Sequence, residues 1–137
     1  EAVGTVPGSN GKALDALNKL WREKKGNPPG EYAPQVWDAV ALLTLAAQAA
    51  KDNSGLGISN KIKEVANPPG KEVTDVCQGL KLLKEGKDIN YQGASGNVDI
   101  DENGDVIGVY NVWTVDSNGK IQVIDKVSPN TTVKMRS

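Results

Sequence analysis

The sequence predicts an α/β chain in which about four helices are followed by a C-terminal sheet rich in β-hairpins. Apolar residues recur at helical spacing through the first part of the chain, and from Asn90 onward they alternate with polar residues. The pairs Asn103-Gly104 and Asn118-Gly119 stand between such alternating runs, which is the strongest short-range signal for a hairpin. This change of period places the helices before the sheet.

Each predicted helix has an apolar stripe and a start signal. Pro34 suits the first turn of the second helix, because its missing N–H would have no intrahelical partner there. That helix runs through Ala50 and is apolar on almost every side, so we expect it to be the most buried element. The other three helices have expected N-caps at Ser9 or Asn10, at Ser59 and at Thr74, and they end near Lys25, Ala66 and Gly86.

Strands are expected near both ends of the chain. A short strand covers Val3–Val6, and the hairpins use Val106–Val115 and Lys120–Val127, which carry the β-branched and aromatic residues that pleated surfaces prefer. We expect a single domain, with residues 1–90 mainly helical, residues 91–127 forming hairpins and residues 128–137 forming a flexible tail.

The composition excludes several classes of function. The 16 basic and 17 acidic residues leave a formal net charge of −1, and Lys and Arg are not clustered, so nucleic-acid binding is disfavoured. The chain has no His and one Cys, which excludes Ser-His-Asp and Cys-His catalysis, an internal disulfide and a thiolate metal cluster. We therefore expect no enzymatic activity, no cofactor and no metal.

Two features concern membranes and processing. The longest apolar run, Ala39 to Ala50, is interrupted by Thr44 and Gln48 and is too short to span a bilayer. The first residues carry neither a basic segment nor an apolar signal core, so we expect the chain to begin within a mature protein or at an artificial boundary.

Carboxylates gather around the first predicted hairpin turn. The pattern Asp99-x-Asp101-x-Asn103-Gly104 matches the first half of a calcium-binding loop, but Tyr110 stands where such a loop needs a bidentate Glu. The expected flanks are strands, whereas that motif needs helices. Carboxylates on a solvated turn are neither buried nor otherwise placed so that their pKa would rise into the range that acid–base catalysis needs. A polar hairpin turn is the favoured interpretation.

Three further positions invite a functional interpretation. The loop Gly93–Gly96 has almost no side-chain bulk, so its backbone can pass close to another element. Tyr32 directly precedes the second helix, where its ring can project into a cleft or pack on the helix as a hydrophobic staple. Cys77 lies beside the apolar stripe of the fourth helix, which favours a buried small side chain over a reactive thiol.

Five segments of the chain together form a recognisable pattern. They are Glu1-Ala2-Val3-Gly4-Thr5, Gly30-Glu31-Tyr32-Ala33-Pro34, Trp37-Asp38-Ala39-Val40, Gly86-Lys87-Asp88-Ile89-Asn90-Tyr91 and Gly93-Ala94-Ser95-Gly96-Asn97-Val98-Asp99. This pattern resembles the C-terminal portion of type I periplasmic solute-binding proteins, in the receptor family of branched-chain amino acid ABC transporters. Trp37 stands where that family usually has Tyr, and Asn97 where it usually has Pro.

The resemblance implies two α/β lobes that are joined by three crossing strands and close on a small solute. This chain would supply late helices of the first lobe and the final crossing, and its hairpins would return to the second lobe. The carboxylate- and ammonium-binding residues of the first lobe would lie upstream. One ligand-binding residue is carried over, Tyr32, while Asp38 is expected to cap or orient its helix.

The resemblance also implies a function. We expect the extracytoplasmic solute-binding component of an ABC transporter, which binds a branched-chain amino acid or a related small polar solute and presents it to a permease. The expected location is periplasmic or extracellular, with a lipid anchor as a further option for the intact protein. The alternative is the ligand-sensing extracellular domain of a receptor, or an amide-responsive regulator.

Taken alone, the 137 residues would leave apolar helix faces and strand edges uncovered. We therefore expect weak or absent ligand binding by the isolated chain, and a homodimer as one way of covering the exposed surface.

Overall fold

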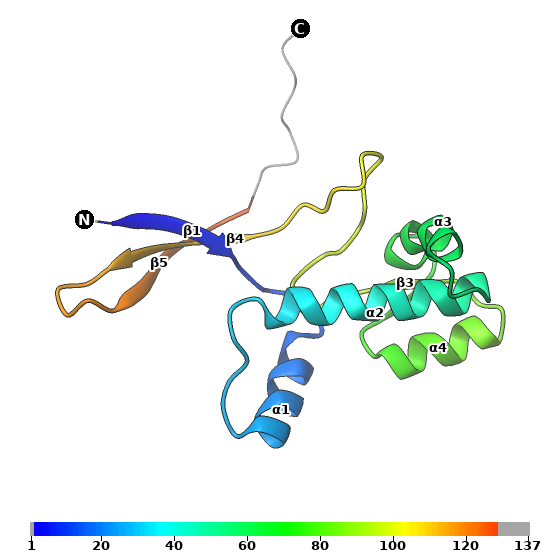
Figure 1. Ribbon diagram of the computed structural model, residues 1–137, viewed down its shortest axis with the longest axis horizontal. Coiled ribbons are helices and arrows are strands. Elements are labelled where there is room, and N and C mark those ends of the chain that lie inside the picture. The colour runs from blue at the N-terminus through cyan, green and yellow to red at the C-terminus, as the bar shows by residue number, and fades with distance from the viewer. Residues whose placement is uncertain (1, 129–137) are drawn as a thin grey trace, which may run out of the picture.

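The computed structural model describes residues 2–128 and separates into a helical body and a projecting three-stranded sheet (Figure 1). All but Ser128 of the predicted tail lies outside the described residues. The elements in chain order are β1 (Val3–Pro7), α1 (Leu14–Lys25), α2 (Ala33–Ala50), α3 (Gly55–Ala66), β2 (Lys71–Val73), α4 (Val76–Lys84), β3 (Ile89–Tyr91), β4 (Tyr110–Val115) and β5 (Ile121–Val127).

The projecting sheet is antiparallel and has the order β1-β4-β5. Val3 pairs with Thr114 and Pro7 with Tyr110, so the first and last parts of the chain lie side by side. The predicted strand at Val3–Val6 and the predicted turn at Asn118-Gly119 are confirmed, with a hydrogen bond from the Gly119 N–H to the Asp116 carbonyl.

The strand predicted over Val106–Val115 is shorter in the structure and begins at Tyr110. Residues 106–109 form only an isolated bridge from Val106 to Ile100 and a hydrogen bond from the Gly8 N–H to the Val109 carbonyl. Gly108 lies in this stretch, and glycine weakens a strand because it offers no side chain to pack.

The core of the helical body surrounds α2 and a two-stranded parallel sheet, β2-β3. β3 is buried along its whole length, and its Ile89 and Tyr91 pack with Leu45 of α2 and Val65 of α3. β2 was not expected from the sequence, because it is three residues long and two of them, Lys71 and Glu72, are exposed.

The prediction that α2 is the most buried element is wrong. One face packs on the core, but Val36 and Val40 are 61% and 58% exposed on the other, and Leu43 is 47% exposed. No described element covers this second face, so it presents an apolar surface to solvent.

Pro34 lies in the first turn of α2 as predicted, but the other helices begin at residues different from those expected. In α3, the Ser54 hydroxyl accepts a hydrogen bond from the Gly57 N–H at 3.1 Å, and in α4, the Asp75 carboxylate accepts one from the Gln78 N–H at 2.7 Å. The observed N-caps are Ala13, Ser54 and Asp75, in place of Ser9 or Asn10, Ser59 and Thr74.

Replacing Leu45 with Ala should lower the free energy of unfolding by about 2–5 kcal/mol, because the side chain is fully buried and its removal leaves a cavity. Urea denaturation followed by circular dichroism measures the change. Leu43→Ala on the exposed face of the same helix is the control and should cost less than about 1 kcal/mol. Equal losses for the two variants would contradict the described core.

Candidate functional site

The loop Gly93–Gly96 follows β3 and lies where the helical body meets the projecting sheet. On one side it contacts Asp38, a carboxylate of α2 that is only 3% exposed. The donors to this carboxylate are the Tyr91 hydroxyl at 3.0 Å, the Ala94 N–H at 2.8 Å, the Ser95 N–H at 2.7 Å and the Ser95 hydroxyl at 2.5 Å.

These contacts show that Asp38 does not cap its own helix, and they agree with the expectation that it orients the helix. It is the sixth residue of α2, and its side chain bonds to β3 and the loop that follows β3 rather than to the helix terminus. Asp38 therefore joins two segments that are more than fifty residues apart in sequence.

On its other side, the loop pairs with the connection between β1 and α1. The N–H groups of Asn10, Gly11 and Ala13 each donate to carbonyls of the loop, at 3.1 Å in all three cases. A Cβ atom on Gly11 would overlap the Gly93 carbonyl, and one on Gly93 would overlap the Asp38 carboxylate. The prediction that this loop passes close to another element is confirmed on both sides.

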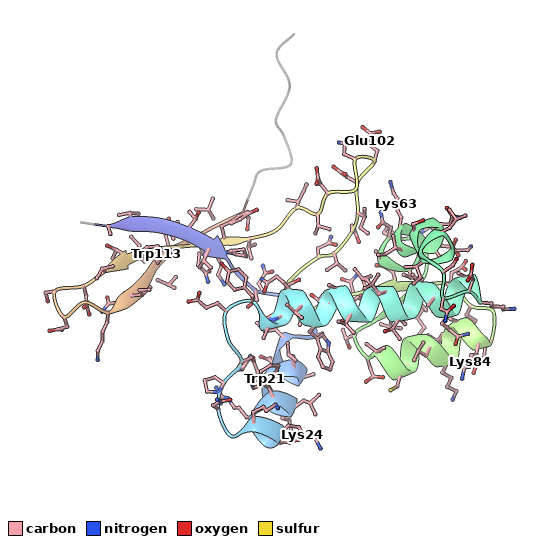
Figure 2. The ribbon with its side chains drawn as sticks, viewed as in Figure 1. Trp21, Lys24, Lys63, Lys84, Glu102 and Trp113 are labelled. Carbon is pink, nitrogen blue, oxygen red and sulfur yellow. The ribbon has the colours of Figure 1, made fainter. Side chains whose placement is uncertain are left out.

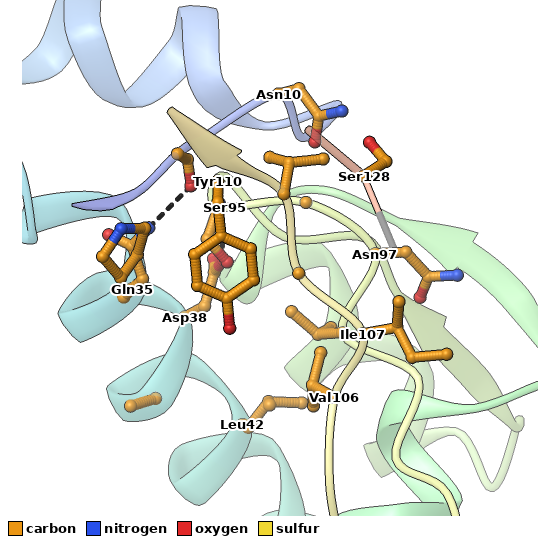
Figure 3. Close-up of a pocket in the computed structure, with 17 residues that line it drawn as sticks. Asn10, Gln35, Asp38, Leu42, Ser95, Asn97, Val106, Ile107, Tyr110 and Ser128 are labelled. Carbon is orange, nitrogen blue, oxygen red and sulfur yellow. Dashed lines mark hydrogen bonds between the residues drawn. The ribbon is translucent and has the colours of Figure 1, made fainter. Parts of the chain in front are cut away.

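A cavity of about 450 Å³ opens beside this junction (Figure 3). Its volume falls in the range of small-molecule sites, roughly 300–1,000 Å³. Apolar side chains from α2 and from residues 98–109 form much of its wall, and Gln35 contributes an amide whose Nε2 donates to the Gly8 carbonyl at 2.8 Å. Its labelled lining residues are Asn10, Gln35, Asp38, Leu42, Ser95, Asn97, Val106, Ile107, Tyr110 and Ser128.

Tyr32 lies at the N-terminal boundary of α2, and its side chain is 57% exposed. It is not among the residues that line the junction cavity. A ligand could reach the exposed ring from solvent, and the role of Tyr32 in ligand binding stays a prediction.

The turn at Asn103-Gly104 is a polar turn held against α3. The Asp101 carboxylate accepts hydrogen bonds from the N–H groups of Asp105 and Asn103, and these bonds hold the pKa of Asp101 below its usual value. Lys63 of α3 donates to the Asp101 carbonyl at 3.0 Å, and Figure 2 shows Lys63 and Glu102 on these neighbouring segments. No metal-binding group of three or more acidic, His or Cys side chains occurs within residues 2–128.

The exposure of Cys77 and the hydrogen bonds of Asn67 were not predicted from the sequence. Cys77 is exposed on α4, so the prediction that it is a buried small side chain is wrong. The amide of Asn67 was not anticipated as a structural residue, yet it donates to the Ile100 carbonyl and accepts from the Ile100 N–H, both at 2.8 Å. These bonds mimic one rung of a β-sheet and fix the segment after the loop.

Comparison with known proteins identifies the family. A model described as the receptor family ligand binding region matches residues 8–118. The chain belongs to this family, the type I periplasmic binding proteins. The predicted fold is confirmed by the leucine binding protein LivK of Thermotoga maritima, whose structure matches 93% of this chain with a TM-score of 0.62 and 22% identity.

One curated relative of this ligand-binding family is similar over part of the chain. It is the chemotactic signal transduction system substrate-binding protein BasB of Halobacterium salinarum, which is 32% identical over 75 residues, or 53% of this chain. The match covers 18% of BasB, and the structural match covers 31% of LivK, so the chain spans less than a third of either. Within the described part, no helix is long and apolar enough to cross a membrane.

The hydroxyl of Tyr91 gives the junction a characteristic pH dependence. Burial of the ring, and secondarily the charge of Asp38, raise the pKa of Tyr91 well above its usual value of 10.0. The neutral phenol is therefore favoured in the folded state. Its stabilising effect is complete below pH 10.0 and is lost as the pH rises above that value, because only the unfolded chain then ionises readily.

Tyr91→Phe should lower the free energy of unfolding by about 1 kcal/mol near neutral pH, because one buried hydrogen bond is lost. The difference between wild type and variant should shrink as the pH rises above 10.0, where only the wild type has this ionising group. Denaturant unfolding across this pH range measures the difference. Tyr32→Phe, at an exposed ring, is the control. A wild-type-to-Tyr91→Phe difference that does not change with pH would contradict the buried pair.

Proposed function

We propose that the protein carrying this chain is the extracytoplasmic solute-binding component of an ABC transporter. It would capture a branched-chain amino acid or a related small polar solute and present it to a membrane permease. The observation that carries the proposal is the match of residues 8–118 to a ligand-binding family. The similarity to BasB, a substrate-binding protein, supports a small-molecule ligand.

The arrangement of the chain suits capture between two lobes. In this proposal the helical body belongs to one lobe, and the sheet β1-β4-β5 leads into the other (Figure 1). Closure of the lobes would bury the solute and pair its polar groups without covalent chemistry, so neither enzymatic activity nor a cofactor is needed. The protein would act in the periplasm or outside the cell, with a lipid anchor as an option.

Within such a cleft, Tyr32 would supply an aromatic ring against the solute. Its exposure and its position at the N-terminal boundary of α2 support this role, because the ring can contact a ligand without rearrangement of the core.

The exposed apolar surfaces fit a larger assembly. Val36, Val40 and Leu43 on α2, with Ile121 and Val123 on β5, are all more than 45% exposed. We propose that other parts of the intact protein cover them, and that the isolated 137 residues bind solute weakly or form a homodimer through these surfaces.

A second candidate function is sensing. BasB, by its name, belongs to a chemotactic signal transduction system, and the same capture of a solute could serve a receptor. The two functions differ in the partner of the closed form, which is a permease in one case and a signalling protein in the other. Deleting the gene should abolish uptake of the solute under the first proposal, and should abolish only the behavioural response under the second.

A thermal-shift panel on the chain extended to its natural start and end tests solute capture. A branched-chain amino acid at 100 times its dissociation constant should raise the free energy of unfolding by about 2.7 kcal/mol. The panel includes leucine, isoleucine and valine, with short amides, urea and aromatic acids as other ligand classes. Stabilisation by none of them would contradict the proposal.

The same assay tests Tyr32. Tyr32→Ala should weaken binding of the solute, whereas Tyr32→Phe, which keeps the ring, should bind nearly as well as wild type. Because Tyr32 is exposed, both variants should have nearly the same melting temperature as wild type when no ligand is present. Equal affinity of wild type and Tyr32→Ala would exclude Tyr32 from the site.

A further inference from the structure

The sheet and the helical body are joined by two neighbouring segments. β1 ends at Pro7 directly opposite Tyr110, where β4 begins. Beyond this pair, the Gly8 N–H donates to the Val109 carbonyl at 2.8 Å, and the strands then separate to enter the helical body. Any change in the direction of the sheet must therefore involve both residues 8–13 and residues 92–109.

The first two turns of α2 hold both of these segments. Gln35 donates to the Gly8 carbonyl, and Asp38 accepts from the N–H groups of Ala94 and Ser95. The two segments are also bonded to each other through the N–H groups of Asn10, Gly11 and Ala13. The start of α2 is thus the common support from which the sheet projects.

Asp38 makes most of the side-chain hydrogen bonds by which α2 holds the loop Gly93–Gly96. Its two carboxylate oxygens accept four hydrogen bonds, and three of the donors lie in the loop Gly93–Gly96. An Asn side chain has the same shape but one acceptor oxygen, so at least one N–H of the loop would lose its partner. Leu45 lies about two turns further along α2, where it packs among apolar side chains.

We propose that Asp38 is the positioning residue of a hinge: by fixing the loop Gly93–Gly96 on α2, it sets the direction in which the sheet β1-β4-β5 leaves the helical body. Under the proposed function, on which this consequence rests, that direction determines the balance between open and closed lobes. Asp38 would then control solute affinity without touching the solute.

Distances between two spin labels test the hinge in the whole 137-residue chain. One label is attached to the exposed native Cys77 on the helical body, and the other to Ser117→Cys in the exposed turn between β4 and β5. Double electron–electron resonance should give a shifted and broadened distance distribution for Asp38→Asn. Asp88→Asn, at an exposed carboxylate away from the junction, is the matched control and should reproduce the wild-type distribution.

A second label pair separates positioning from general loosening. Labels at Cys77 and Asn60→Cys both lie on the helical body, so Asp38→Asn should leave their distance distribution unchanged. Broadening of both pairs would show that Asp38 supports the whole fold, and an unchanged Cys77–Ser117→Cys distribution would show that it positions nothing. Either result overturns the proposal.

If Asp38→Asn does not fold, Ser95→Ala provides the test, because it removes one donor to the carboxylate and leaves the charge in place. In Ser95→Ala, the distribution of distances between the labels at Cys77 and Ser117→Cys should shift and broaden, because the loop is held less firmly on α2. An unchanged distribution would overturn the proposal. No solute is used in these measurements. Failure of the hinge and failure of solute capture are therefore distinguishable.

Discussion

The buried carboxylate of Asp38 is the interaction on which the arrangement of the chain depends. Moving a carboxylate from water into the protein interior costs several kcal/mol of free energy unless its oxygens are hydrogen-bonded. Here the Tyr91 hydroxyl and three donors of the following loop bond to it. Because these donors come from β3 and the loop, the stable folded state requires the loop to lie against the start of α2.

This constraint extends from the core to the place where the helical body meets the sheet β1-β4-β5. The loop held by Asp38 also pairs with the segment that follows β1, and that segment leads out of the projecting sheet. The junction cavity opens at the same place, beside residues from all of these segments. The contacts that stabilise the loop therefore also hold the two segments that connect the sheet to the helical body.

Local signals in the sequence predicted much of the fold, and long-range contacts account for most of what it did not predict. Asn118-Gly119 specifies its turn through backbone preferences, and the small residues at 93–96 indicate a close approach. The N-cap of α3 at Ser54 was missed because Gly55 and Gly57 are poor helix formers, and packing of the helix on α2 overrides that preference. The partners of Asp38 could not be predicted, because no local pattern marks a contact across 56 residues.

Amide hydrogen exchange at Ala94 and Ser95 tests the central claim most directly. If both N–H groups donate to the buried Asp38 carboxylate, they should exchange only through large unfolding events, as slowly as the amides of the buried strand β3. Exchange as fast as that of exposed Glu102 in the turn would contradict the account, because the loop would then open without unfolding the core.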